Sequence, residues 1–345
     1  MVKSIKKIRS AIKGMATFYT EVEGIKLGKK PIDFLLINVP PNCNYRCKKC
    51  FTRANSRKIK NTLTLEDIFK LIKEGKKLGA KSVSILGEGE PLIYKNIKQV
   101  ISYINKLGMI PIIATNGRLL TKEMINFLDK HNTTIGFSLD TLDEKKYFEY
   151  CGGNASLPKV LKNIDYARKL YVKRIYEKNN YRVYQLLLHM TVTPKNFKNM
   201  SQLKKFCKND IFFDSQPLAE IGDAQKNISF FGKKLTYERY QKEGHHLIPP
   251  MVLTKTEKGK DICCLFYYGL AVGYNGEIMF DTHAIGLDGN IGNIRNYPLV
   301  KLLEKIKRLK ELYLTKYKTG YCPVRSPTYK RFIKDIKINN DQKRN

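Results

Sequence analysis

Residues 31–50 read PIDFLLINVPPNCNYRCKKC, a short apolar run that ends in prolines and leads directly into three cysteines. The apolar run predicts a buried strand. Cys43, Cys47 and Cys50 have the spacing C-x3-C-x2-C, so three thiolates within eight residues can reach one metal centre. A structural zinc site needs four protein ligands, whereas three fit a four-iron cluster with one iron left open. A zinc loop completed by a distant cysteine and an accidental cluster are the alternatives.

Beyond this loop, strand-like runs alternate with helical patterns. We expect strands at 82–86, 109–115, 133–139, 184–192 and 210–215, and helices at 64–79, 96–107, 121–130, across 143–170 and at 196–206. Thr64 and Asp67 resemble a capping pair for the first helix. The alternation predicts a parallel sheet with covering helices, either doubly wound or barrel-like. In both architectures ligands bind at the carboxyl ends of the strands.

Short polar segments follow three of the expected strands. They are Gly87-Glu88-Gly89-Glu90-Pro91-Leu92, Thr115-Asn116-Gly117 and Ser138-Leu139-Asp140. Glycine permits close backbone approach, and Glu90 offers an anion to an ammonium group. Each segment alone is typical of a turn or a helix cap. Their order at successive strand ends, next to the cysteine loop, predicts a single binding site.

Together these features resemble the radical SAM superfamily over roughly residues 33–217. The resemblance implies an α/β fold, a partial (β/α)6 TIM-like barrel, with a [4Fe-4S] cluster on Cys43, Cys47 and Cys50. It also implies that strand-end residues bind S-adenosylmethionine (SAM), namely Gly89, Glu90, Pro91, Asn116, Ser138 and Asp140. Two positions depart from the family pattern: Lys49 stands where an aromatic residue is usual, and Glu88 replaces a glycine.

The resemblance further implies an enzyme, a radical SAM oxidoreductase or maturase. One electron from the cluster would cleave SAM to methionine and a 5′-deoxyadenosyl radical, which would abstract hydrogen from a substrate. An external one-electron donor is implied as a partner. In such enzymes the cofactor carries the difficult chemistry and the protein orients it.

A C-terminal segment resembles a SPASM domain, so we expect a small SPASM-like extension after the barrel. Cys264 is followed by Gly276 and by Asp281 at the place of a cysteine, and Cys322 lies beyond a basic helical stretch at 299–318. The pattern is degenerate. We therefore expect a metal-free remnant, with a second iron–sulfur cluster that includes Cys264 and Cys322 as the alternative.

The expected organisation has five parts. They are a basic N-terminal segment (1–30), the radical SAM barrel (31–222), a linker or insertion (223–262), the SPASM-like domain (263–329) and a polar tail (330–345). No run is long and apolar enough to span a bilayer, and the first residues lack the apolar region of a secretory signal. A cytoplasmic location with reduced thiols follows as an expectation.

The net charge of +33 bears on the substrate. The excess consists mainly of Lys spread along the chain, which fits a coding bias as well as attraction to a polyanion or an acidic peptide. From the resemblance we expect a peptide or protein substrate. RNA, a nucleotide-derived cofactor or a sugar is the alternative, and a non-catalytic, metal-stabilised nucleic-acid-binding protein is a remote one.

Two further side chains have a structural and a functional interpretation. Cys151 follows a predicted helix and is either a packed thiol or a hydrogen-atom donor near the barrel mouth. His189 lies in a strand predicted to be buried, where a histidine with satisfied hydrogen bonds is more frequent than a base.

Overall fold

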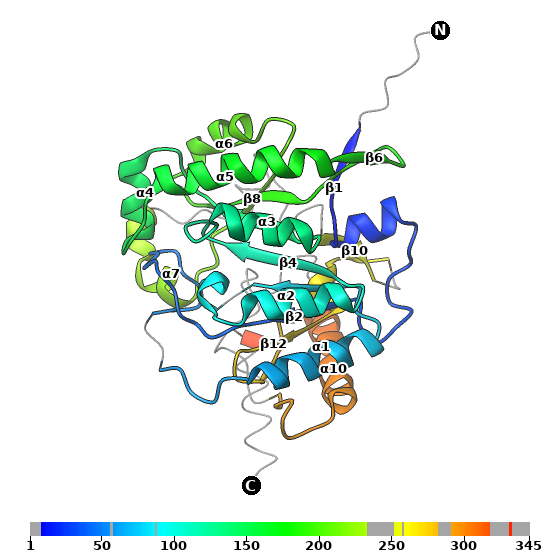
Figure 1. The fold of residues 1–345 in the computed structure, drawn as a ribbon. Helices are drawn as coiled ribbons and strands as arrows, with labels where there is room; N and C mark the ends of the chain where they lie inside the picture. The colour runs from blue at the N-terminus through cyan, green and yellow to red at the C-terminus, as the bar shows by residue number, and fades with distance from the viewer. Residues whose placement is uncertain are drawn as a thin grey trace.

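The computed structural model describes residues 8–55, 58–86, 88–232, 252–256, 259–281, 291–317 and 331–332. Its main feature is an eight-stranded sheet of order β13-β12-β2-β3-β4-β5-β8-β9 (Figure 1). All neighbours pair in parallel except β12 and β13, which are antiparallel. In chain order the strands are β2 (Phe34–Ile37), β3 (Ser82–Ile85), β4 (Ile110–Thr115), β5 (Thr134–Ser138), β8 (Leu186–Val192), β9 (Phe212–Pro217), β12 (Gly269–Val272) and β13 (Ile278–Met279).

Helices connect the parallel strands as the sequence predicts. They are α1 (Leu65–Lys77), α2 (Ile97–Lys106), α3 (Lys122–Lys130), α4 (Glu144–Cys151), α5 (Leu157–Tyr171) and α6 (Met200–Cys207), followed by α7 (Gly222–Lys226), α9 (Cys264–Tyr267) and α10 (Leu299–Tyr317). The expected capping pair at α1 is confirmed, because Thr64 and Asp67 each accept the other's backbone N–H. Side-chain caps on Thr64, Thr121 and Asp143 mark where α1, α3 and α4 begin.

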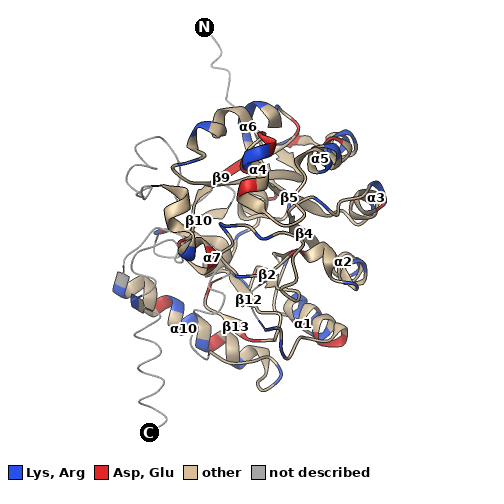
Figure 2. Ribbon diagram, turned by 90° about the vertical axis from the view of Figure 1, so that its left-hand side faces the viewer, with Lys and Arg blue, Asp and Glu red and all other residues tan. Residues whose placement is uncertain are grey.

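The two faces of the main sheet pack against different partners. Leu35, Ile113 and Leu188 belong to the core cluster that contains the apolar faces of the helices. The alternating residues Leu36, Ile112 and Leu187 belong to a second cluster on the other face. Because α1, α2, α3 and α5 all cover the same face (Figures 1 and 2), the sheet forms a partial (β/α)6 barrel and is not doubly wound.

The N-terminal segment closes the amino-terminal end of the barrel. β1 (Arg9–Ile12) pairs in parallel with β7 (Tyr181–Tyr184), which pairs with β6 (Tyr176–Lys178), and a π-helical turn, η1 (Phe18–Val22), follows. Eight apolar residues from Ala11 to Leu27 are buried in the inner cluster. Carbonyl oxygens of Lys13 and Gly14 accept hydrogen bonds from Thr134 and Ser82, the first residues of β5 and β3. The carboxyl end therefore remains as the place for a site.

The sheet continues beyond the expected domain boundary at residue 263. β12, from the expected SPASM-like domain, pairs in parallel with β2 at the edge of the barrel sheet. A short hairpin, β10 (Leu253–Lys255) with β11 (Asp261–Cys263), precedes it. The division into five parts stays a prediction, but residues 8–27 and 269–279 pack as parts of the barrel. Cys322 lies outside the described residues.

Charged side chains are distributed over the outside of the barrel. Figure 2 shows Lys and Arg on α1, α2, α3, α5 and α10, with Asp and Glu among them. The described residues include no helix that is both long enough and apolar enough to cross a membrane.

Candidate functional site

The cysteine loop lies at the carboxyl end of β2, held by two elements that are distant in sequence. The backbone N–H groups of Arg46 and Lys48 donate to the carbonyl oxygens of Cys151 and Tyr150 at the end of α4, at 2.8 and 2.9 Å. On the other side, the N–H of Asp223 in α7 donates to the Cys50 carbonyl at 2.7 Å. The loop backbone is thereby fixed while the three thiols remain half-buried.

The three thiols lie close enough to influence one another. Burial raises the pKa of the Cys43 thiol to about 12, and the neighbouring Cys47 and Cys50 add to the rise. A hydrogen bond with the Cys151 thiol, together with burial, raises the pKa of Cys47, and Cys50 Sγ lies 3.2 Å from Thr52 Oγ1. Among the residues that the structure describes, no three Cys, His, Asp or Glu side chains form a metal-binding group.

The donor set nevertheless fits a [4Fe-4S] cluster. Three soft thiol ligands in one anchored loop suit iron and sulfur, and their partners are weak ones that a side-chain rotation can release. The raised thiol pKa means that metal binding must displace protons, so loading becomes more favourable as the pH rises.

Glu90 connects the end of β3 to the end of β4. Its carboxylate is 2% exposed. It accepts hydrogen bonds from Thr115 Oγ1 at 2.7 Å, from the Asn116 N–H at 2.8 Å and from the Leu92 N–H at 3.2 Å. Burial raises the pKa of Glu90, and these three donors oppose the rise. The side chain is therefore rigid and stands where the sequence predicts a SAM ligand.

The segments that follow β3 and β4 contact the cysteine loop and include Gly89, Pro91 and Asn116. A Cβ atom on Gly89 would lie 2.2 Å from the Asn42 carbonyl oxygen, so only glycine fits this close approach. Pro91 begins a 3-10 turn, η2 (Pro91–Ile93), that Glu90 caps. Asn116 Nδ2 donates to Asn44 Oδ1 at 2.9 Å. The carboxyl ends of β3 and β4 and the cysteine loop are thus joined by direct contacts.

Ser138 and Asp140 contact Lys49, a residue that departs from the family pattern and has no role predicted from the sequence. Lys49 Nζ lies 2.6 Å from Asp140 Oδ2 and donates to Ser138 Oγ at 3.2 Å and to Thr191 Oγ1 at 3.3 Å. Burial lowers the pKa of Lys49, but Asp140 together with Cys151 and Cys47 raises it, and the net shift is upward. Both predicted SAM contacts at this strand end are therefore partners of the cysteine loop.

The sequence singled out His189, Cys151 and Glu88, but it missed Asp214. Asp214 in β9 accepts His189 Nδ1 at 2.6 Å, so His189 is oriented by a carboxylate that is only 4% exposed, while 28% of the histidine side chain is exposed. Cys151 is buried beside Cys47. Glu88 is buried, and its Oε1 accepts the Tyr274 N–H at 3.4 Å. The alternation of β8 and β9 places His189 and Asp214 on the inner face, a signal that becomes usable once the register is known.

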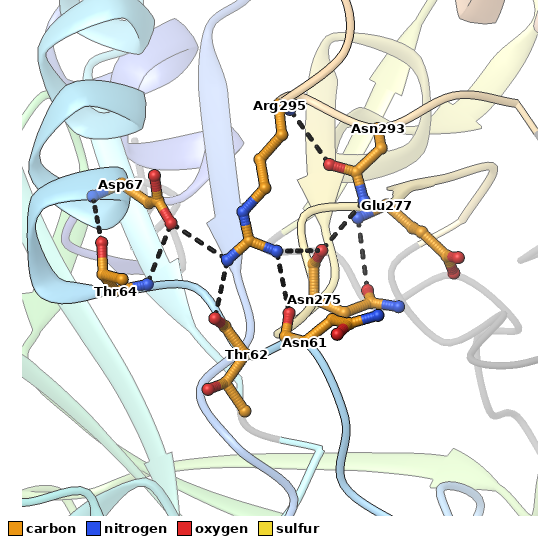
Figure 3. Close-up of polar contacts among 8 residues, drawn as sticks. All are labelled: Asn61, Thr62, Thr64, Asp67, Asn275, Glu277, Asn293 and Arg295. Atoms are coloured by element: carbon orange, nitrogen blue, oxygen red, sulfur yellow. Dashed lines mark hydrogen bonds and ion pairs between the residues drawn. The ribbon is translucent and has the colours of Figure 1, made fainter.

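Arg295 fastens the C-terminal region to the end of the cysteine loop (Figure 3). Its guanidinium donates to the carbonyl oxygens of Asn61 at 2.9 Å and Thr62 at 2.6 Å, and to Asp67 Oδ2 at 3.0 Å. Since Asp67 also caps α1, one arginine joins the exit of the loop, the start of a helix and the segment around Asn293. The C-terminal region thus holds the end of the cysteine loop in place through the contacts of Arg295.

The alternative of a second metal site meets a lysine near its candidate ligands. Cys264 is fully buried in the inner apolar cluster, where burial raises its pKa well above the usual value. Lys310 of α10 is 5% exposed and donates to the Gly269 carbonyl at 2.7 Å. Burial lowers the pKa of Lys310 to about 8, with Asp281 and Cys263 opposing. A buried ammonium group near Asp281 and Cys263 disfavours a metal cation there.

A Lys310→Met variant is expected to be more stable than the parent at pH 7, by up to about 3 kcal/mol. In the folded chain Lys310 loses its proton near pH 8, but in the unfolded chain only near 10.4. The unfolded state then binds more protons between these values, so the parent gains stability as the pH rises through them. Thermal unfolding at pH 7, 8, 9 and 10 measures this.

The exposed Lys301 on the same helix provides the matched control, Lys301→Met. The difference in unfolding temperature between parent and Lys310→Met should shrink steadily above pH 8, whereas that for the control should stay flat. A difference that is independent of pH would show that Lys310 is not a buried ammonium group.

Comparisons with known proteins agree with this geometry. Residues 37–202 match the family model of the radical SAM superfamily. A GTP 3′,8-cyclase of Clostridium perfringens is 35% identical over 144 residues, which cover 41% of this chain and 44% of that protein. The chain thus matches less than half the length of this relative.

Two solved structures resemble the fold over more of the chain. Streptococcus suis SuiB bound to its precursor peptide SuiA has a TM-score of 0.59 at 22% identity and covers 78% of this chain and 64% of its own. The enzyme anSMEcpe with bound SAM has a TM-score of 0.55 at 14% identity and covers 90% and 100%. Residues 37–202 of this chain form a radical SAM domain, the domain of enzymes whose cofactors are a [4Fe-4S] cluster and SAM.

Proposed function

We propose that Cys43, Cys47 and Cys50 hold a [4Fe-4S] cluster with one iron open to SAM. With electrons from an external one-electron donor, the bound cofactors supply reductive cleavage of SAM to a 5′-deoxyadenosyl radical that abstracts hydrogen from a substrate. The observation that carries this proposal is the position of the loop: its thiols stand at the carboxyl end of the barrel, joined by Asn44 and Lys49 to the polar strand ends.

The polar strand ends have the chemistry that a zwitterionic cofactor needs. A carboxylate has about four acceptor sites, and Glu90 uses three of them on Leu92, Thr115 and Asn116. In this proposal the remaining site accepts the ammonium group of SAM. Gly89 allows the backbone to approach closely, and Ser138 and Asp140 offer a hydroxyl and a carboxylate to the sugar and amino-acid moieties.

We propose that the substrate is a peptide or protein. The net charge of +33, with exposed Arg46 and Arg53 on the cysteine loop, suits an acidic partner. A nucleotide is the second candidate, favoured by the 35% identity to a protein named GTP 3′,8-cyclase. A reducing cytoplasmic location belongs to the same proposal, because cluster ligands must remain reduced thiols.

The C-terminal region is, in this proposal, a degenerate SPASM-like extension without its own cluster. Burial of Cys264 in the apolar core and the buried Lys310 near Asp281 support this assignment. One cluster per chain then gives about four iron atoms, whereas a second cluster would give about eight.

Anaerobic reconstitution with iron and sulfide tests the chemistry. We expect a brown protein with about four iron atoms per chain that releases 5′-deoxyadenosine from SAM when dithionite is added. The measurements are iron analysis, the visible absorption spectrum and chromatography of the products. A colourless protein that takes up zinc in place of iron would refute the proposal.

The substrate class is tested by stimulation of SAM cleavage. Short peptides encoded beside this gene are the peptide probes, and GTP is the nucleotide probe. We expect faster 5′-deoxyadenosine formation and a mass change in a peptide. If GTP accelerates cleavage and is consumed, while every peptide remains unmodified, the nucleotide candidate replaces the peptide.

A further inference from the structure

Lys49 makes an unusual set of contacts for a residue inside a cluster-binding motif. It lies between Cys47 and Cys50, and its side chain is only 13% exposed. An ammonium group has three N–H donors, and three oxygens lie within reach: Asp140 Oδ2 at 2.6 Å, Ser138 Oγ at 3.2 Å and Thr191 Oγ1 at 3.3 Å. Every donor of Lys49 thus has a partner on the barrel.

These partners belong to two adjacent strand ends. Ser138 ends β5, Asp140 follows it, and Thr191 lies in β8, the neighbour of β5 in the sheet. The second carboxylate oxygen of Asp140 accepts the Thr191 N–H at 2.9 Å, which fixes the acceptor itself. An apolar residue at position 49 could form none of these bonds, and an aromatic residue could not form the ion pair. The ion pair between Lys49 and Asp140 therefore anchors the middle of the cysteine loop on the barrel, and this anchoring depends on the positive charge of Lys49.

We propose that Lys49 is a positioning residue for the cluster: it anchors the cysteine loop on β5 and β8 and places a positive charge beside the thiolates. This rests on the cluster assignment of the proposed function. A positive charge near an iron–sulfur cluster favours the reduced form, which carries one more negative charge, and so raises the reduction potential. Removing one partner of a buried ion pair also leaves the other charge uncompensated.

Four variants separate anchoring from charge. Lys49→Met removes both the anchoring contacts and the positive charge, whereas Lys49→Arg keeps the charge. The double variant Lys49→Met/Asp140→Asn restores local neutrality but lacks the anchoring ion pair. Lys48→Met is the matched control, because the ammonium group of this neighbouring residue lies over the Phe230 ring, 3.7 Å from its centre. The readouts are iron release to a chelator, the midpoint potential of the SAM-free reconstituted protein, and amide hydrogen exchange of residues 44–52 in the iron-free protein.

We expect Lys49→Met to exchange amides and lose iron about tenfold faster than Lys48→Met, and to have a lower midpoint potential. Lys49→Arg should remain near the parent in all three readouts. The double variant should regain the potential but not the iron retention. A parent-like potential in Lys49→Met, or amide exchange equal to that of Lys48→Met, would overturn the proposal.

The exchange measurement also separates this inference from the proposed function. If the parent itself binds no iron, the cluster assignment fails, but amide exchange in the iron-free protein still decides whether Lys49 anchors the loop. If Lys49→Met holds too little iron for a redox titration, amide exchange still tests the anchoring, and the midpoint potential of Lys49→Arg tests the effect of the charge.

Discussion

A Cys50→Ala variant is expected to lose the cluster and, with it, all measurable cleavage of SAM. Two thiols cannot hold the four-iron cluster that three hold with one iron open, so iron after reconstitution should fall from about four atoms per chain to below about one. The rate of 5′-deoxyadenosine formation should fall by more than about a hundredfold, since even indirect changes around a metal ligand cost 10- to 100-fold. Iron analysis and product chromatography measure both effects.

The fold should survive this change. Cys50 contributes its carbonyl to the N–H of Asp223, and alanine keeps that backbone bond. Cys207→Ala is the matched control, because Cys207 is buried on α6 and takes no part in the loop. The control should bind iron like the parent. Equal iron content in Cys50→Ala and Cys207→Ala would disprove the ligand assignment.

Cys47 needs a different design because a fourth thiol lies beside it. Cys151 hydrogen-bonds to Cys47 and is only 7% exposed, so it could supply a replacement ligand. A Cys47→Ala variant must therefore be compared with Cys47→Ala/Cys151→Ala before any residual iron is interpreted.

Local patterns predicted the barrel because each unit carries its own signals. Apolar runs mark β2 to β5, β8 and β9, and the Thr64–Asp67 cap marks where α1 begins. Each of these is decided within a few residues of the chain. The closed amino-terminal end was not predictable in this way. Residues 8–27 include several basic residues. The burial of their apolar side chains depends on the inner face of the sheet, which forms only when distant strands assemble.

The candidate site shows the same limit at the level of side chains. Spacing identified the three cysteines and the strand-end segments, and the family comparison confirms the class of enzyme. Spacing could not pair Lys49 with Asp140, Asn44 with Asn116 or His189 with Asp214, since each pair joins different strand ends. Such contacts depend on register and loop path, which no single stretch of sequence contains.

Glu90→Gln is expected to weaken both the fold and SAM binding. The amide has about the same size, but its NH2 group must face a donor, either Thr115 Oγ1–H or the Asn116 N–H. An unsatisfied buried donor costs about 1–3 kcal/mol of stability, and loss of the anion should weaken SAM binding by about tenfold or more. Thermal unfolding and calorimetric titration of SAM into the reconstituted protein measure the two losses.

The pH dependence gives Glu90 a signature that a merely structural residue would lack. Burial raises its pKa in the folded protein, so the folded state binds more protons than the unfolded state above about pH 4.3. The parent should therefore lose stability relative to Glu90→Gln as the pH rises from about 4.3 to the raised pKa, and no further beyond it. Glu123→Gln is the control with the opposite sign, because Lys98 lowers the pKa of that exposed carboxyl. A stability difference for Glu90→Gln that does not change with pH, together with SAM affinity equal to that of the control, would show that Glu90 is neither a buried anion nor a cofactor ligand.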